Sequence, residues 1–318
     1  MKVVICLEKF SDWLEAYSIF QYYTSIKEVK ILFLEDHRNN MYSVRKLFQE
    51  YQREYPFYYE GHKIKSEFID AIGDTISIMK KGDVLAAPFV RYRSIWKYVR
   101  LARTKKIQTV HLSESLPDSF GPIGYRFGFK IKKINLKQLL AIPAMYLYAI
   151  THKPDLCFYN MGEYIKNPFC RKTIKAYIPS IAKEKSDFLH KITGGQKRPL
   201  LISGFEYDHK KMANALNIKQ YIATSKLNKI IIDGQQIPLD FFICAEEVLL
   251  SGYSDSIIGY NTTAMCWAKL VGNMKITCYE SKKLSFLTGF MYGILSRRTL
   301  KKCGITLLPQ CAEMVVKY

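Results

Sequence analysis

Short apolar runs alternate with longer segments of helical periodicity along the first half of the chain, and this rhythm constrains the fold more than any other feature. The runs that predict strands are residues 3–7, 30–34, 84–87 and 109–112. The segments that predict helices are residues 11–26, 41–55, 66–81 and 94–106. Strands and helices in alternation predict a parallel sheet with helices on both of its faces.

The second half of the chain repeats the pattern after a polar segment. Residues 193–198 read Thr-Gly-Gly-Gln-Lys-Arg, which is typical of an interdomain linker. Beyond it we expect strands at 200–203, 229–232, 256–259 and 275–279, and helices at 241–250 and 262–271. The 318 residues, 48% of them hydrophobic, are enough to bury two cores. We therefore expect an α/β protein of two Rossmann-like domains, residues 1–192 and residues 199–318.

The chain is strongly basic. Lys and Arg number 48 against 28 Asp and Glu, which gives a formal net charge of +20. An excess of this size indicates a polyanionic partner, which could be nucleic acid, anionic lipid or a phosphorylated substrate.

Cysteine spacing and the N-terminal segment bear on metal binding and location. The eight cysteines include no Cys-x-x-Cys pair and no His at ligand spacing, so we expect no metal site and mostly reduced core thiols. Residues 1–10 open on a strand-like run with Glu8, without the basic flank and long apolar stretch of a signal peptide. A cytoplasmic location is therefore expected.

The longest apolar run is residues 139–150, which is 12 residues and contains Pro143. A spanning helix needs about 20 residues, so this run predicts either a core helix or a segment that lies at a membrane surface.

A polar turn in the second half follows a buried strand. The strand ends at Gly259, and Asn261, Thr262 and Thr263 open the next helix. A helix N-terminus at the carboxyl end of a parallel strand favours a phosphate, because its free N–H groups and the helix dipole both attract an anion. The alternative is that Asn261 or Thr262 is an ordinary N-cap.

A carboxylate follows a strand in the first half. Residues 109–112 run into Ser113-Glu114-Ser115, which puts Glu114 at the end of the sheet where ligands bind. A carboxylate there could take the proton from an attacking hydroxyl as a general base. Asp118 is a weaker candidate, and Glu114 could also be a solvated loop residue.

A basic segment with interleaved aromatic residues spans residues 91–106 and contains no acidic residue. Arg93, Lys97 and Arg100 share one face of the predicted helix, and Arg91 precedes them. Residues 119–154 also lack acidic residues and end in the apolar run 139–150. Basic residues beside a short apolar helix suit an anionic membrane surface. The alternatives are a solvated face and nucleic-acid binding, which no RRM, KH or zinc-finger pattern supports.

The segment Ile257-Ile-Gly-Tyr-Asn-Thr-Thr-Ala-Met resembles the hydroxyl-pair motif of bacterial sialyltransferases and polysialyltransferases. The resemblance implies a GT-B-like fold in which two Rossmann-like domains face a cleft that holds a nucleotide sugar. It also implies that Thr262 and Thr263 contact the phosphate of CMP-sialic acid and that Glu114 is the general base. The family's second acidic residue and its His-Pro pair are absent, and His209 could stand in for the latter.

The function that the resemblance implies is glycosyl transfer, with sialic acid moving from CMP-sialic acid to a glycan or glycolipid acceptor of a capsule or lipooligosaccharide. No cofactor is expected, and the sequence contains no Asp-x-Asp motif, which agrees with metal-independent transfer. An Arg of residues 91–93 could hold a substrate carboxylate. The enzyme would work in the cytoplasm at the inner face of the cell membrane. The alternatives are a catalytically degenerate GT-B-like binding or assembly protein, and a transferase that uses another nucleotide sugar.

Overall fold

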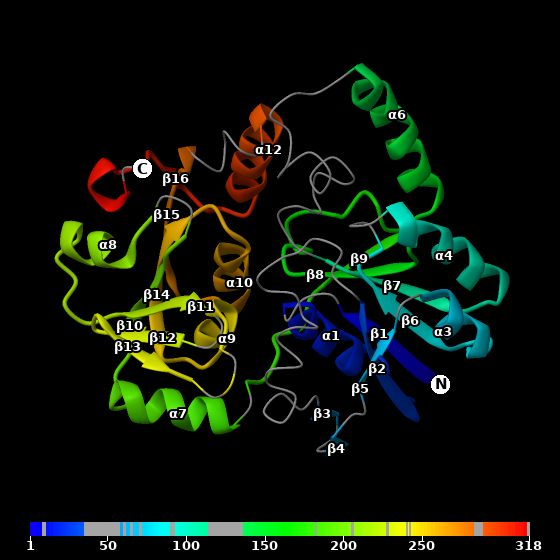
Figure 1. The fold of residues 1–318 in the computed structure, drawn as a ribbon, viewed down its shortest axis with the longest axis horizontal. Coiled ribbons are helices and arrows are strands. Elements are labelled where there is room, and N and C mark those ends of the chain that lie inside the picture. The colour runs from blue at the N-terminus through cyan, green and yellow to red at the C-terminus, as the bar shows by residue number, and fades with distance from the viewer. Residues whose placement is uncertain are drawn as a thin grey trace. The chain divides into compact units, whose positions relative to one another are not determined.

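The computed structural model divides the chain into two compact units, Met1–Tyr177 and Ile178–Tyr318 (Figure 1). The residues that it describes are 1–7, 11–34, 58–59, 62–63, 66–69, 72–89, 93–113, 136–181, 183–204, 207–226, 229–239, 241, 243–282 and 289–316. The division falls earlier than the polar segment 193–198, where we expected a linker, so that the helix over residues 183–193 belongs to the second unit.

The first unit is built on a seven-stranded sheet in the order β5-β2-β1-β6-β7-β8-β9, with every neighbouring pair parallel. Its strands are β1 (Lys2–Leu7), β2 (Glu28–Leu34), β5 (Ser66–Ile69), β6 (Val84–Ala87), β7 (Gln108–Leu112), β8 (Leu156–Tyr159) and β9 (Lys172–Lys175). The short strands β3 (Tyr58–Tyr59) and β4 (His62–Lys63) pair separately.

Helices cover both faces of this sheet, as Figure 1 shows. They are α1 (Ser11–Tyr22), α3 (Ile72–Ile78), α4 (Arg93–Thr104) and α6 (Leu136–Thr151). Residues of α3, α4 and α6 share one hydrophobic core with Val4, Leu32 and Leu85 of the strands. The strand β2 lies on one side of β1, and β6 lies on its other side. Because crossovers between parallel strands are right-handed, α1 lies on the face of the sheet opposite to α3, α4 and α6.

The second unit contains a mixed seven-stranded sheet in the order β13-β12-β11-β10-β14-β15-β16. The strands are β10 (Arg198–Ile202), β11 (Ile222–Lys226), β12 (Lys229–Ile232), β13 (Gln235–Pro238), β14 (Ser254–Tyr260), β15 (Lys275–Tyr279) and β16 (Leu307–Leu308). The five neighbouring strands β11-β10-β14-β15-β16 are parallel, whereas β12 and β13 form an antiparallel edge beside β11.

The second unit begins with a helix before β10, and its other helices follow strands of the sheet. The helices are α7 (Lys183–Thr193), α8 (His209–Ala215), α9 (Ala245–Leu250), α10 (Thr263–Val271), α12 (Gly289–Lys302) and a 3-10 turn, η2 (Ala312–Met314). Lys185 of α7 and Glu247 of α9 form a buried ion pair of 2.5 Å, and Glu247 also accepts a hydrogen bond from the Cys244 N–H. This carboxylate therefore holds the start of α9 and ties α7 to it.

The two parallel-rich sheets confirm the α/β class with two Rossmann-like domains. The helix expected over residues 66–81 is wrong at its start, because Ser66–Ile69 forms strand β5 and pairs with β2. The helix that follows is α3. The expected helix over residues 41–55 lies outside the described residues.

Seven of the eight cysteines are buried, in agreement with the expectation of core thiols. Burial raises the pKa of Cys6 and Cys278 to about 12, so both are protonated. Where the structure describes the chain, no three side chains are grouped as metal ligands, and none of the helices has the length and apolar character to cross a bilayer.

Candidate functional site

The order of strands marks one point on the second sheet. The chain passes from β10 to β11 on one side and later returns to β14 on the other side of β10. In open α/β sheets, ligands bind outside the carboxyl ends of the strands at such a switch point. The residues after β10 and after β14 are therefore the candidates for binding in this unit.

Two glycines allow the backbone to be unusually close at this point. A Cβ on Gly259 of β14 would lie 2.7 Å from the Cβ of Ile202 and 3.1 Å from Cε of Met265. Gly204, which follows β10 with φ of +143°, would place a Cβ 2.6 Å from the hydroxyl of Tyr260. Gly259 therefore has a packing role in positioning α10, which begins three residues after the end of β14.

The N-terminus of α10 carries the two hydroxyl residues of the motif. Thr262 is the N-cap, with φ of −119° and ψ of 167°, but its side chain makes no capping hydrogen bond. Its Oγ1 is buried and has no hydrogen-bond partner in the part of the chain that the structure describes. A threonine at this position usually bonds a backbone N–H of the first turn. Here the hydroxyl of Thr262 makes no such bond within the described structure, and the dipole of α10 favours an anion at this end of the helix.

Asn261 has a structural task beside them. It is 3% exposed, its Nδ2 donates to Oγ of Ser296 (3.3 Å), and its Oδ1 accepts from the N–H of Ser281 (3.4 Å). These bonds attach the turn between β14 and α10 to α12 and to the segment after β15. The amide of Asn261 thus fixes the turn, and Thr262 is the residue of the motif whose hydroxyl is best suited to meet a ligand.

A row of tyrosines at the same edge is a feature that the sequence analysis missed. Tyr207 stacks on Tyr260 with 5.6 Å between ring centroids and 6° between planes, and it lies 6.4 Å from Tyr279. Its hydroxyl donates to the carbonyl of Glu280 (2.5 Å). Tyr260 and Tyr279 are the last residues of neighbouring strands in register. An aromatic residue at the end of each apolar run was the available signal.

His209 is the first residue of α8, after the N-cap Asp208, whose side chain accepts from the N–H of Lys211 (3.0 Å). The ring of His209 lies 6.2 Å from that of Tyr221, the residue before β11. Burial lowers the pKa of His209, Asp208 opposes this shift and Lys210 adds to it. The imidazole is therefore mostly neutral at pH 7 and can donate one N–H.

The first sheet has a corresponding edge, at which β7 and β8 end side by side. Glu114 directly follows the buried Ser113 and lies outside the described residues. Asn160 directly follows β8 and is 5% exposed, and neither its Oδ1 nor its Nδ2 has a hydrogen-bond partner in the described structure. A buried amide without partners is costly, by about 1–3 kcal/mol, so Asn160 is a further candidate for ligand contact. A polar residue after an apolar strand was the sequence signal here too.

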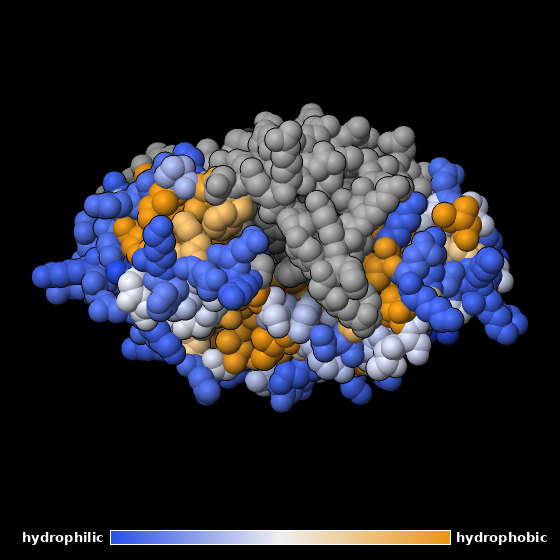
Figure 2. Space-filling model, turned by 90° about the horizontal axis from the view of Figure 1, so that it is seen from below, coloured by the Kyte–Doolittle hydropathy of each residue, from blue (hydrophilic) through white to orange (hydrophobic). Residues whose placement is uncertain are grey.

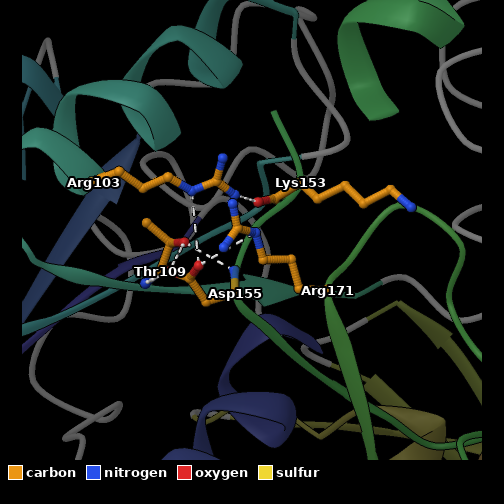
Figure 3. A network of polar contacts seen from close by, with 5 residues as sticks. All are labelled: Arg103, Thr109, Lys153, Asp155 and Arg171. Atoms are coloured by element: carbon orange, nitrogen blue, oxygen red, sulfur yellow. Dashed lines mark hydrogen bonds and ion pairs between the residues drawn. The ribbon is translucent and has the colours of Figure 1, made fainter. Parts of the chain in front are cut away.

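The opposite, amino edge of this sheet is held by ion pairs (Figure 3). Asp155, before β8, accepts from the N–H (3.0 Å) and the hydroxyl (2.7 Å) of Thr109 in β7. Arg103 and Arg171 approach its other oxygen at 3.8 and 3.9 Å, and Arg103 also donates to the carbonyl of Lys153. Burial lowers the pKa of Arg103, and the charge of Arg171 adds to this effect. These contacts join α4 to three strands and are explained by structure alone.

The basic segment of the sequence is only partly described. Arg91 lies outside the described residues, and Arg93 begins α4. Lys97 and Arg100 are exposed on one face of this helix, as the periodicity predicted. The Nζ of Lys97 lies 4.9 Å from the centroid of the Tyr98 ring.

These two sheets, each with a switch point, define the class as an α/β protein of two Rossmann-like units. No protein-family model matches the sequence, and no curated protein matches it. Among solved structures, the chain is similar to the alpha/beta-galactoside alpha-2,3-sialyltransferase of the luminous marine bacterium Photobacterium phosphoreum. The TM-score is 0.47 and the identity 8%, over 96% of this chain and 97% of that chain. The two sheets by themselves establish the fold class.

Proposed function

We propose that the chain is a GT-B-like glycosyltransferase that transfers sialic acid from CMP-sialic acid to a cell-surface glycan. The observation that carries the proposal is the buried hydroxyl of Thr262, without a partner among the described residues, at the N-terminus of α10 and at the switch point of the second sheet. The likeness of residues 257–265 to the hydroxyl-pair motif of bacterial sialyltransferases supports the choice of donor.

The chemistry of the donor suits this position. In CMP-sialic acid the anomeric carbon of the sugar is bonded to an oxygen of the nucleotide's phosphate, and transfer leaves the electrons of that bond on the phosphate. The charge would develop where the N–H groups of α10, its dipole and the hydroxyls of Thr262 and Thr263 favour an anion. The neutral imidazole of His209 is the candidate for one further N–H donor.

The acceptor half of the reaction is assigned to the first unit. The acceptor hydroxyl would attack the anomeric carbon and give its proton to the carboxylate of Glu114, while the bond between the sugar and the phosphate breaks. The products are the glycoside, CMP and a protonated Glu114. Asn160 could bond an acceptor hydroxyl, because its amide offers both a donor and an acceptor.

The second candidate is a catalytically degenerate GT-B-like protein that binds a nucleotide or a glycan within an assembly. The replacement of the family's acidic pair by Ser113-Glu114-Ser115 and the absence of a His-Pro pair favour it. A transferase that uses another nucleotide sugar would keep the same phosphate chemistry and differ in the base and the sugar.

A transfer assay with matched variants distinguishes these functions. The purified full chain is incubated with CMP-sialic acid and a panel of galactosides, and both CMP release and the glycoside are measured. We expect Glu114→Gln to bind CMP as the natural chain does but to form product at least about 100-fold more slowly, since general-base catalysis contributes about 10²–10⁴-fold. Asp118→Asn is the control and keeps its activity. Equal activity of both variants contradicts the role of Glu114, and CMP binding without turnover by the natural chain favours the non-enzyme function.

A further inference from the structure

Helix α6 is apolar on two sides, and only one of them is covered. Ala149 is buried in the core of the first unit and Tyr146 packs against it. Pro143 and Ala144 are exposed on another side of the same helix, together with Leu147 at 66% and Ile150 at 52% exposure. The sequence predicted either a core helix or a surface segment for the apolar run 139–150. The run lies in a helix that is buried on one side and exposed on another, so it has both characters. A helix that is apolar on all sides usually lies in a core or in contact with lipid.

The two other helices on this face of the sheet, α4 and α3, also expose aliphatic side chains. Leu101 of α4 is 42% exposed and Ile78 of α3 is 58% exposed. Because α3, α4 and α6 pack on the same face of the first sheet, their uncovered sides all point away from it (Figure 1). Of the eight large hydrophobic residues that are exposed in the described structure, these three helices hold four. We call Ile78, Leu101, Leu147 and Ile150, with the basic residues described next, the outer helical face.

The charge of the outer helical face is basic. Lys97 and Arg100 of α4 are exposed in the same helical turns as Leu101. Lys80 and Lys81 are exposed in the turn before β6, and Lys106 is exposed in the turn after α4. The three described helices α3, α4 and α6 contain one acidic residue, Asp74. Single exposed hydrophobic residues are common on soluble proteins, but an aliphatic helix side flanked by cations is typical of a membrane-surface helix. Figure 2, a view from below that labels no element, shows orange hydrophobic residues among the blue hydrophilic ones on the described surface.

We propose that the outer helical face docks the first unit on an anionic lipid bilayer. Leu147 and Ile150 enter the boundary between headgroups and acyl chains, and Lys97 and Arg100 contact lipid phosphates. A second copy of the chain is a poorer occupant, because two basic faces repel each other. Nucleic acid would use the cations and gain little from exposed aliphatic side chains. The docking surface is independent of the donor site, which lies in the other unit.

Flotation of the full chain with lipid vesicles tests the proposal in the absence of any nucleotide or glycan. We expect binding to vesicles of phosphatidylcholine with phosphatidylglycerol and little binding to phosphatidylcholine alone. Leu147→Glu/Ile150→Glu should weaken binding more than tenfold, because it removes the insertion and adds two repelled charges. Lys97→Ser and Arg100→Ser should each weaken it by about fivefold, the equivalent of about 1 kcal/mol for each charge near the surface.

A matched control uses two exposed apolar residues of the second unit. Ile178→Glu/Leu308→Glu introduces the same charges at side chains that are 49% and 37% exposed, and it should leave vesicle binding unchanged. All four positions are exposed, so the thermal midpoints of the variants should match that of the natural chain. Full binding of Leu147→Glu/Ile150→Glu would overturn the proposal, as would equal binding to neutral and anionic vesicles. Dimerisation in solution that the same variant abolishes would show a second copy as the occupant instead.

Discussion

Replacement of Thr262 by valine separates a ligand-binding hydroxyl from a structural one. Valine has the shape of threonine, is compatible with the extended backbone at φ of −119° and ψ of 167°, and lacks the hydroxyl. The Oγ1 of Thr262 is buried without a partner in the described structure, and no capping bond is lost. Because a buried, unsatisfied hydroxyl is destabilising, Thr262→Val should leave the free energy of unfolding unchanged or raise it by up to about 1 kcal/mol.

The same substitution should weaken nucleotide binding. A hydrogen bond to a charged group contributes about 1.5–3 kcal/mol, so Thr262→Val should raise the Kd for CMP by about 10- to 150-fold. Thr262→Ser keeps the hydroxyl and should bind CMP nearly as the natural chain does. Calorimetry gives the Kd, and denaturant unfolding followed by circular dichroism gives the stability.

Thr193→Val is the matched control, because the buried hydroxyl of Thr193 donates to the carbonyl of Leu189 at 2.7 Å. Loss of that bond should cost about 0.5–1.5 kcal/mol of stability and leave CMP affinity unchanged. If Thr262→Val loses more than about 1 kcal/mol of stability and retains its CMP affinity, the hydroxyl of Thr262 is a helix cap and the reasoning is refuted.

Three further tests concern a close backbone contact, a buried ion pair and a titratable group of the second unit. Gly259→Ala should lower the free energy of unfolding by about 1–3 kcal/mol, because the added Cβ meets Ile202 at 2.7 Å; unchanged unfolding in urea would contradict the close packing. Lys185→Met should cost about 3–5 kcal/mol by leaving Glu247 buried without its cation, and adding Glu247→Gln should restore part of this loss in a double-mutant cycle. Burial lowers the pKa of His209, so this residue contributes stability that is present above about pH 6.5 and lost as the pH falls through its folded pKa. Thermal midpoints measured from pH 8 to pH 5 should therefore fall less steeply for His209→Gln than for the natural chain, and parallel curves would show that the ring is not desolvated.

The strands and helices that alternate in the sequence were predictable because their apolar periodicity is local. The run at residues 84–87 became the fully buried β6, and residues 262–271 became an N-cap followed by α10. Residues 66–69 were predicted as helix, yet they form β5, because pairing with Ile31 to Leu34 of β2 outweighs a local pattern that fits both structures.

The antiparallel edge of the second sheet was not predicted, although the sequence carries a signal for it. Asp233-Gly234 joins β12 and β13, and both residues have positive φ, at 51° and 87°. An Asp-Gly pair between two apolar runs is typical of a two-residue hairpin. The strand at residues 229–232 was correctly placed, but its direction depends on that turn.

The candidate site was predictable only in part. Residues 259–263 could be placed from sequence because a strand, a turn and a helix start follow one another within a short segment. The distinction between Asn261, whose amide is bonded to Ser281 and Ser296, and Thr262, whose hydroxyl is not bonded within the described structure, depends on distant residues. The stacking of Tyr207 on Tyr260, and the lack of a hydrogen-bond partner for the amide of Asn160 in the described structure, could not be predicted either. Both depend on residues that are distant in the sequence.

The most direct test of the central claim is a calorimetric titration of the natural chain with CMP, UDP and GDP. We predict that CMP binds at one site per chain and that UDP and GDP bind at least about tenfold more weakly, a difference of about 1.4 kcal/mol. Selective binding of UDP or GDP would keep the phosphate site and replace the donor. If none of the three nucleotides binds, the proposal of a donor site at the N-terminus of α10 is contradicted.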